Sequence, residues 1–594
     1  MTNNFFDRLY QEWADAFRHG PRNLPRRFRN QIRHFQNNQF DYVVLPLGGT
    51  FPPFDPPPLS FIQRQLPIPE PDLSLQSLYK RLRRIQEADN ADGLLILLRD
   101  LNTGFATLQN IRQAISRVRD AGKKVAVYTP YLTTPHYFLA SAADTIIAPP
   151  SAEFGVIGLR SEAIFLKDTL AQLGITGDFI QISPYKSANN IFNHNQVTPE
   201  QAEQMKWLLD ETFDLITTPM AAGRNLPLDT LHNLIDQAPF FAHEAQQHNL
   251  IDHVAYEDDL PHLLATNTPI STATETDDDK SPPIQLAPWS KAAPKLLEKP
   301  VRYHDKHIGI IPLIGTIIMG PSQNAPPIDL PLPVVNDGLA GEETIIQLIR
   351  QAEQDDDLAA LIFYIDSPGG VALASDLIWR ELDRLGQKIP ILAYMGDVAA
   401  SGGYYVAAPA QHIMAQTGTI TGSIGVLIGR FALSGLYDKL KINRYHVARG
   451  RHAGLYSSPD PLTDEERALI EDAIHTTYDQ FKQVVADGRD LPIDQLDPIC
   501  EGRVWTGRQA LNHQLIDSHG DLLDAINQAA QLANLPQQDN LRIPVVTYQL
   551  KDSHPYQLPQ ASPTQDLLQL LNGQRLRHLQ GHPLYLLPYH WQWW

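Results

Sequence analysis

The sequence has little cysteine and no long apolar run. Cys500 is the single cysteine among 594 residues, so no disulfide can form within the chain, and we expect its thiol to be packed in a core. No stretch reaches the ~18 apolar residues of a transmembrane helix, and the N-terminus lacks the apolar run of a secretory signal. These absences predict a protein located in the cytoplasm or peripherally on a membrane.

Basic charge is also scarce. The 48 Lys and Arg residues stand against 67 Asp and Glu, for a formal net charge of −19. Proteins that bind the phosphate backbone display clustered basic side chains, so no nucleic-acid partner is expected. The composition, 43% hydrophobic and 19% charged, is typical of a soluble globular protein. The length predicts two or more domains.

The N-terminal segment departs from this average. Residues 1–36 hold seven arginines against three acids, and prolines cluster in residues 52–71, where an extended surface segment is expected. Bulky apolar residues follow helical spacing over residues 5–17, namely Phe5, Phe6, Leu9, Trp13 and Phe17. An amphipathic helix followed by basic residues fits peripheral contact with an anionic membrane. Docking on the protein's own core or on another subunit explains the same stripe equally well.

The chain contains a long internal repeat. Residues 221–252 match residues 486–517 without a gap, at an offset of 265 positions. Upstream, GLLILLRD ending at Asp100 matches ALIFYID ending at Asp366. Self-similarity of this length indicates two homologous domains in tandem.

Each repeat alternates short apolar runs with amphipathic helical patterns, as in LAALIFYID followed by ALASDLIWRELDRL. This alternation predicts an α/β fold whose strands are covered on both faces. Between the repeats, Thr, Ser, Pro and three successive acids cannot bury enough apolar surface to become ordered. The predicted organisation is an N-terminal segment 1–85, a first repeat 86–262, a linker 263–303, a second repeat 304–535 and a C-terminal extension 536–594.

Three small-residue motifs of the second repeat carry candidate chemistry. After a strand, Asp366-Ser367-Pro368-Gly369-Gly370 allows close backbone approach, and amides there can stabilise a developing anion, although a lone SPGG is more simply a tight turn. Ser401 in AASGGYY has an accessible hydroxyl, although such a serine alone is more often a helix cap. Ser423 lies in the turn TGSIG, which can bring a second hydroxyl close to the first.

In this order and spacing, the three motifs resemble the signal peptide peptidase A family, whose fold is that of the ClpP and crotonase superfamily. The resemblance implies that Ser401 is the nucleophile and that Ser423 hydrogen-bonds a catalytic lysine. It also implies an oxyanion hole formed by Gly369, Gly370 and Gly402.

The general base is not found in the second repeat. Short, single-repeat members of the family have a lysine after the TGSIG segment. The corresponding stretch of this chain offers Arg449, Arg451 and His452, and an arginine cannot deprotonate in a protein. The register between the repeats places Lys186 of PYKSANN opposite Arg451, and the tandem form of the family carries its base lysine in a YKSA motif. Lys186 is therefore the expected base.

Each repeat then keeps one half of a catalytic pair. In the first repeat Thr133-Thr134-Pro135-His136-Tyr137 replaces Ala400-Ser401-Gly402-Gly403-Tyr404. We expect a composite site between the two domains, in which burial lowers the pKa of Lys186 enough for it to act as a base. A Ser-His-Asp triad with His446 or His452 remains an alternative, as does a Lys186 that is merely solvated.

The resemblance further implies a serine endopeptidase that cleaves hydrophobic peptides, such as remnant signal peptides, through an acyl-enzyme. It implies a homotetramer and neither a metal nor a cofactor. The tandem form of the family often starts with a transmembrane anchor, where the amphipathic and basic segment is expected here. The chain also has Asp366 where Asn is frequent and a Pro-rich insertion at 319–341, expected as a rim loop. The aromatic tail HPLYLLPYHWQWW fits a membrane interface, a subunit groove or the chain's own core.

Two other function classes share parts of this pattern. A crotonase-type acyl-CoA hydratase or isomerase would use the same paired amides, and a catalytically inactive scaffold would only bind peptides or membranes. Covalent labelling by a fluorophosphonate separates both from a serine peptidase, because neither needs a reactive serine.

Overall fold

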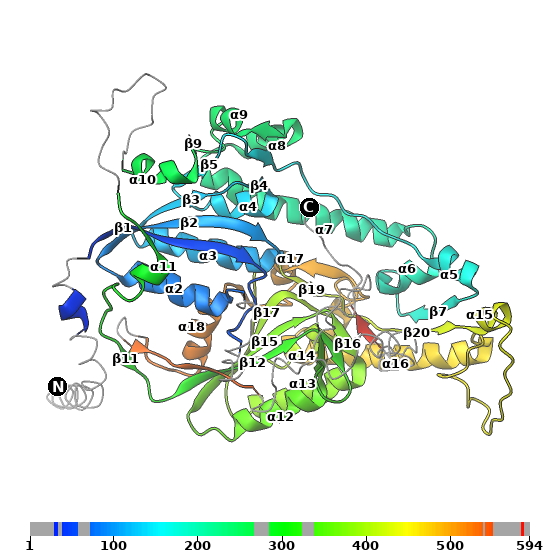
Figure 1. Cartoon of the computed structure of the whole chain (residues 1–594). Coiled ribbons are helices and arrows are strands. Elements are labelled where there is room, and N and C mark those ends of the chain that lie inside the picture. Colours follow the sequence, from blue (N-terminus) through cyan, green and yellow to red (C-terminus); the bar gives the residue numbers. More distant parts are fainter. Residues whose placement is uncertain are drawn as a thin grey trace.

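The computed structural model shows two α/β units that lie side by side and share a buried core (Figure 1). It describes residues 29–33, 38–56, 72–265, 284–323, 338–537, 541–549 and 584–586. The apolar stripe at 5–17, the centre of the 319–341 insertion and most of the aromatic tail lie outside the described residues.

The first unit is built on a six-stranded parallel sheet in the order β10-β1-β2-β3-β5-β9. Alternate residues of β2 face different cores: Leu94 and Ile96 join the main core, whereas Leu95 packs on the opposite face with α10. The strands are β1 (Phe40–Gly49), β2 (Ala91–Leu101), β3 (Lys124–Tyr128), β5 (Thr145–Ala148), β9 (His253–Val254) and β10 (Leu286–Pro288). The helices of this unit are α2 (Leu75–Glu87), α3 (Phe105–Asp120), α4 (Thr134–Ala140), α7 (Pro199–Gly223), α8 (Leu228–Gln237), α9 (Ala242–Gln247) and α10 (Leu260–Leu263).

The second unit repeats this plan with a larger sheet, ordered β21-β19-β17-β15-β12-β24, in which only β21 runs antiparallel to its neighbour; β18 pairs with β17 and β22. Its strands are β12 (His307–Ile314), β15 (Leu358–Ser367), β17 (Ile391–Ala400), β18 (His412–Ala415), β19 (Ile420–Gly422), β21 (Val504–Thr506), β22 (Ser518–His519) and β24 (Val545–Thr547). Its helices are α12 (Glu342–Glu353), α13 (Ala372–Gly386), α14 (Gly402–Ala407), α16 (Asp464–Arg489), α17 (Gly507–Asn512) and α18 (Leu522–Leu532). The predicted α/β fold and its tandem duplication are confirmed.

The interface between the units is part of the protein core. Side chains of α2 and α3 share one apolar cluster with Ile362 and Tyr394 of the second sheet and with Leu522 of α18. The ring of Phe54 meets that of Tyr364 edge-on at a centroid distance of 5.0 Å. Because apolar burial is the main favourable term in folding, such a continuous core holds the two units in a defined relative position.

Ordered elements of the first unit also lie outside the predicted range 86–262. β1 and most of α2 precede residue 86, and β10 together with α11 (Trp289–Ala292) lies within the predicted linker 263–303. The polar, acidic part of that linker ends before β10, where Ala287 and Leu296 are buried. The predicted linker 263–303 therefore changes from a polar part to an apolar part that packs on the first unit.

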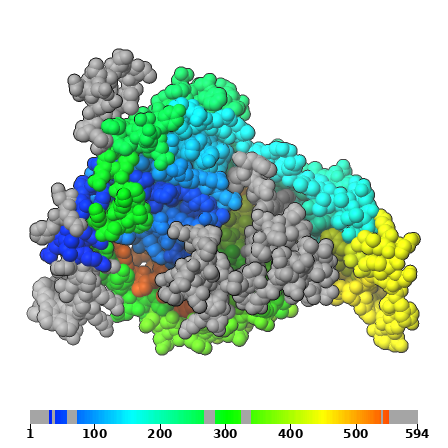
Figure 2. Space-filling view, in the orientation of Figure 1, coloured from blue at the N-terminus to red at the C-terminus, as the bar shows by residue number. Residues whose placement is uncertain are grey.

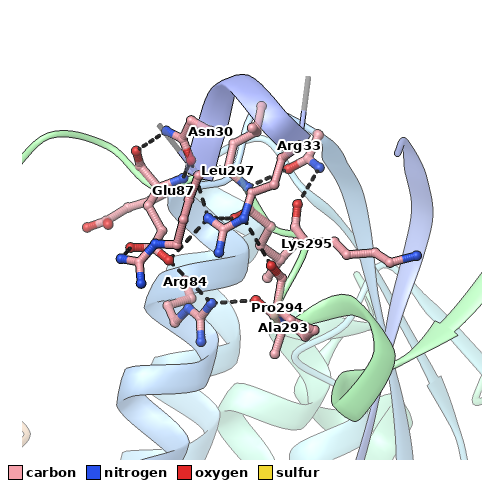
Figure 3. A network of polar contacts seen from close by, with 12 residues as sticks. Asn30, Arg33, Arg84, Glu87, Ala293, Pro294, Lys295 and Leu297 are labelled. Carbon is pink, nitrogen blue, oxygen red and sulfur yellow. Dashed lines mark hydrogen bonds and ion pairs between the residues drawn. The ribbon is translucent and has the colours of Figure 1, made fainter. Parts of the chain in front are cut away.

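A polar network fastens this connection to the first unit (Figure 3). Arg33 is only 8% exposed and donates from Nε to the carbonyl oxygen of Pro294 at 2.9 Å and from Nη1 to that of Leu296 at 2.7 Å. Arg84 of α2 donates to the carbonyl oxygen of Ala293. These bonds supply partners for backbone carbonyls in a segment that has no regular structure of its own.

A third sheet joins the two repeats, in the order β14-β13-β16-β25-β20-β7. Its strands are β7 (Thr176–Gln181), β13 (Thr316–Ile318), β14 (Leu339–Gly341), β16 (Gly369–Val371), β20 (Leu427–Ala432) and β25 (Leu584–Leu586). β7 of the first repeat runs antiparallel to β20 of the second. Together with α5 (Lys167–Leu173), α6 (Asn190–Asn193) and α15 (Ser434–Lys439), these two strands belong to an arm, cyan and yellow in Figure 2, that projects from the body.

The base of the 319–341 insertion is closed by Gln323, whose N–H donates to Leu339 O at 2.9 Å. The remaining strands are β4 (Leu132–Thr133), β6 (Glu153–Gly155) and β8 (Phe240–Phe241) in one sheet and β11 (Arg302–Tyr303) with β23 (Leu541–Arg542) in another.

Cys500 is buried, and burial raises the pKa of its thiol to about 12. No helix in the described part of the chain is both long and apolar enough to cross a bilayer.

Candidate functional site

Ser401 occupies a strained turn between β17 and α14. Its φ of 55° and ψ of −114° lie outside the regions that a non-glycine residue ordinarily adopts. The turn is held by the Ser401 N–H, which donates to Gly422 O at 2.7 Å. Backbone strain of this kind is kept only where the surroundings determine it, and it is concentrated at functional sites.

Lys186 reaches Ser401 from the other repeat. It follows β7, and its side chain is fully buried at the junction of the two units. Its Nζ lies 2.6 Å from Oγ of Ser401 and 3.0 Å from Oγ of Ser423, and it donates to Ser423 O at 2.8 Å. Burial lowers the pKa of the Lys186 ammonium well below the ordinary lysine value. The neutral amine, which can accept a proton, is thereby favoured.

Ser423 is positioned by its own turn. Its φ is 52°, and its N–H donates to Arg503 O at 2.6 Å. The preceding Gly422 has a φ of 77° and lies against Trp505, so a side chain there would meet the indole ring. The TGSIG turn therefore directs the Ser423 hydroxyl and carbonyl toward the amine of Lys186.

The three glycines expected around an oxyanion converge beside Ser401. A Cβ placed on Gly402 would lie 3.2 Å from the backbone nitrogen of Gly370 and 3.3 Å from Cα of Gly369. Gly369 has a φ of 105°, and its N–H donates to Ser367 Oγ at 3.2 Å. A Cβ on Gly370 would overlap the carbonyl oxygen of Ile317. Gly370 therefore leaves no room for a side chain, and Gly369 has a backbone conformation that favours glycine.

The arginine and histidine candidates lie in other environments. His446 is exposed, and the His452 ring lies 3.9 Å from the carboxylate of Glu465. Arg451, the counterpart of Lys186, forms an ion pair of 2.7 Å with the same carboxylate. The contacts of the Ser401 hydroxyl thus favour a lysine over a histidine as its partner.

A segment that the sequence analysis missed holds Lys186 in place. Gly502 has a φ of 79°, and a Cβ there would lie 2.7 Å from both Cα and Cβ of Lys186. The guanidinium of Arg503 lies 4.0 Å above the ring of Tyr185, the neighbour of Lys186. The available signal was the repeat register, in which Gly502 stands opposite Gln237. The glycine lies in the second repeat, which lacks the lysine, and it leaves room for the backbone of Lys186 from the first repeat.

Asp397, which lies four residues before Ser401, links the two repeats. The sequence alone did not reveal this role. Its carboxylate accepts from the Thr107 N–H at 2.9 Å and from the Thr107 hydroxyl at 2.6 Å, at the first turn of α3. A side chain on Gly104 would overlap this carboxyl group. Burial raises the pKa of Asp397, while the bonds from Thr107 oppose that rise. Gly104 and Thr107 of the first repeat thus receive a carboxylate of the second.

Replacing Asp397 with alanine is expected to lower the free energy of unfolding by about 1–3 kcal/mol, because two donors of Thr107 lose their acceptor at a buried interface. Asp397→Asn retains one acceptor oxygen and should cost less. Chemical unfolding followed by tryptophan fluorescence measures both. An unchanged midpoint for the alanine variant would show that water replaces the carboxylate without loss.

Comparisons with known proteins agree with the tandem arrangement of two repeats. The model for "Peptidase family S49" matches residues 117–270 and residues 383–536, one match in each repeat and together more than half of the chain. The chain is 31% identical over 465 residues to "Serine protease SPPA, chloroplastic" of Arabidopsis thaliana, an alignment that covers 78% of this chain and 66% of the relative. It is 30% identical over 468 residues to "Protease 4" of Haemophilus influenzae, covering 76% and 72%. A shorter match, 30% over 196 residues, is to "Putative signal peptide peptidase SppA" of Enterococcus faecium, covering 32% of this chain and 57% of the relative.

Proposed function

Since the chain belongs to peptidase family S49 and is a serine-type peptidase, we propose that Ser401 is its nucleophile and Lys186 its general base. The observation that carries the proposal is the separation of 2.6 Å between Nζ of Lys186 and Oγ of Ser401, at a fully buried position. A serine hydroxyl needs a base to take its proton, and a desolvated lysine amine supplies one near neutral pH. The active site is therefore composite, with one residue from each repeat.

In the proposed reaction, Oγ of Ser401 attacks the carbonyl carbon of the scissile peptide bond while its proton passes to Nζ of Lys186. The amides around Gly369, Gly370 and Gly402 stabilise the negative charge that develops on the carbonyl oxygen. The tetrahedral intermediate collapses to an acyl-enzyme, and the leaving amine receives the proton from Lys186. A water molecule then attacks the ester, with Lys186 again accepting and returning a proton, and Ser401 is regenerated.

Ser423 is proposed to orient the base. Its hydroxyl and carbonyl oxygens both lie within hydrogen-bond distance of Nζ, so the amine is held toward Ser401. No charged partner is needed, because burial alone lowers the pKa of Lys186. An amine that is fixed and uncharged serves repeated proton transfers without rearrangement.

Hydrophobic, signal-peptide-like segments are the proposed substrates, in keeping with the name of the Enterococcus faecium relative. We also propose a homotetramer and peripheral contact with a membrane. Assembly is supported by large apolar side chains that the arm exposes after α15; Tyr445 is 93% exposed, and the others are Leu440, Ile442 and Val447. Exposed apolar groups that gather on one projection are typical of protein contacts.

Labelling with a fluorescent fluorophosphonate tests the nucleophile. The wild-type chain is expected to take up label on one serine, and Ser401→Ala should take up none, since the probe requires an activated hydroxyl. Ser434→Ala, in α15 of the arm, is the matched control and should label like the wild type. A folded wild-type chain that remains unlabelled would favour the hydratase or scaffold class, and labelled Ser401→Ala would place the nucleophile elsewhere.

A further inference from the structure

A short strand from the C-terminal extension is inserted beside the candidate site. β25 pairs antiparallel with β16 in the register Gly369↔Leu586, Gly370↔Tyr585 and Val371↔Leu584. On its other side it pairs antiparallel with β20 through Leu427↔Leu584. In Figure 1 β25 is the red segment near the label of β16. The tail therefore supplies an inner strand of the sheet that joins the repeats.

β25 fills a slot that is one strand wide. β16 and β20 are neighbours of β25 in the strand order and are not paired with each other. Without β25, each would present a row of backbone N–H and C=O groups toward the other. Such facing edges bind an extended peptide by strand addition, with main-chain hydrogen bonds on both sides.

The slot leads to the proposed catalytic residues. β16 contains Gly369 and Gly370, and β25 also contacts α14, the helix that begins directly after Ser401. β16 runs from Gly369 to Val371, so the antiparallel β25 passes Val371 first and reaches Gly369 with its last residue. A peptide of this polarity brings its C-terminal end toward the oxyanion glycines. That is the orientation in which residues on the acyl side of a scissile bond approach a nucleophile.

We propose that residues 584–586 are an intramolecular competitor of the substrate, held by strand addition in the slot between β16 and β20. The inference rests on the proposed function in one respect, that this slot leads to the nucleophile. The tail sequence fits a short inserted strand, because Pro583 and Pro588 flank it and a proline lacks the N–H that a ladder needs. The strand is thereby confined to the residues between the two prolines.

Attachment to the same chain makes such a competitor effective. A tethered ligand experiences an effective concentration on the order of millimolar, so a tail with a dissociation constant of about 0.1 mM occupies the slot about 90% of the time. A peptide added from solution would then bind about tenfold more weakly than to an empty slot. Substrates with a higher affinity displace the tail.

The test measures the binding of a fluorescein-labelled peptide corresponding to residues 580–589 by fluorescence anisotropy. The full-length chain carries Ser401→Ala, so that no cleavage occurs. Adding Tyr585→Pro, which removes the N–H opposite Gly370, is expected to tighten peptide binding about tenfold. Leu586→Pro is a second variant with the same expected gain. Gln574→Pro, outside β25, is the control and should leave the affinity unchanged.

Turnover gives an independent readout with Ser401 intact. Tyr585→Pro is expected to raise kcat/KM for a quenched hydrophobic peptide about tenfold and to leave kcat unchanged, as removal of a competitor requires. Equal affinities in all variants, or no peptide binding up to 1 mM, which is about ten times the assumed constant, would overturn the inference. If the peptide binds as expected while the wild-type chain neither labels nor turns over, the slot stands and the proposed nucleophile fails.

Discussion

Replacing Lys186 with methionine is expected to lower peptide turnover by about 10⁴-fold or more while it stabilises the protein at neutral pH. The loss of turnover follows because no other base contacts Ser401 among the described residues, and removing the base of a serine peptidase has effects of this size. Methionine has a similar length and no charge, so it can fill the volume of the lysine stem in the buried site.

The gain in stability follows from the direction of the pKa shift. In the folded chain burial lowers the pKa of Lys186, whereas in the unfolded chain it has the ordinary lysine value of about 10.4. Between these two values the unfolded state binds more protons, so the stability of the wild type rises with pH across this window. The burial penalty is complete below the folded pKa and has vanished above the unfolded one. The advantage of the methionine variant should therefore be largest at low pH and disappear toward pH ~10.4.

Chemical unfolding of the wild type and Lys186→Met at several pH values measures this difference. Lys206→Met, on the exposed face of α7, removes a lysine of the same repeat without a burial effect and should leave the pH dependence unchanged. A stability difference that is independent of pH would contradict a buried, neutral Lys186. Protonation of Lys186 also predicts that kcat/KM of the wild type falls as the pH drops through the pKa of Lys186 in the folded chain, because the protonated amine cannot act as a base.

Replacing Gly502 with alanine is expected to lower turnover about 100-fold, since a displacement of about 1 Å at a catalytic group has effects of that order. The new Cβ would lie 2.7 Å from Cα and Cβ of Lys186, and the contact involves backbone that cannot rotate away. The lysine must shift, and its separation from Ser401 changes with it. Steady-state kinetics with a quenched peptide measures the effect, which should fall on kcat.

Matched controls separate this clash from ordinary glycine strain. Gly122 and Gly450 have φ values of 83° and 92°, and a Cβ at either position meets nothing within 4 Å. Gly122→Ala and Gly450→Ala therefore carry the left-handed backbone strain of Gly502→Ala without its contact, and both should keep wild-type kcat. If Gly502→Ala behaves like these two variants, the segment around Gly502 does not position the base.

The sequence by itself determined the features that are visible within a short window or that occur in both repeats. The tandem repeat, the α/β alternation and the small residues around Ser401 are all visible within short windows, because a strand, a helix or a tight turn imposes its pattern on adjacent residues. The reciprocal losses in the two repeats also pointed to Lys186, since a duplicated fold provides its own alignment.

Only the tertiary structure decided how these parts meet. Ser401 and Lys186 are 215 positions apart, and no local pattern states a separation of 2.6 Å between their side chains. The approach of Gly502 to Lys186, the bond from Thr107 to Asp397 and the insertion of β25 beside β16 are likewise contacts between distant segments. Such contacts depend on the packing of whole elements around a common core, so they are absent from any one segment. The sequence pointed to Ser401 and Lys186 as residues of the proposed composite site, and the packing of the two units decided that they touch.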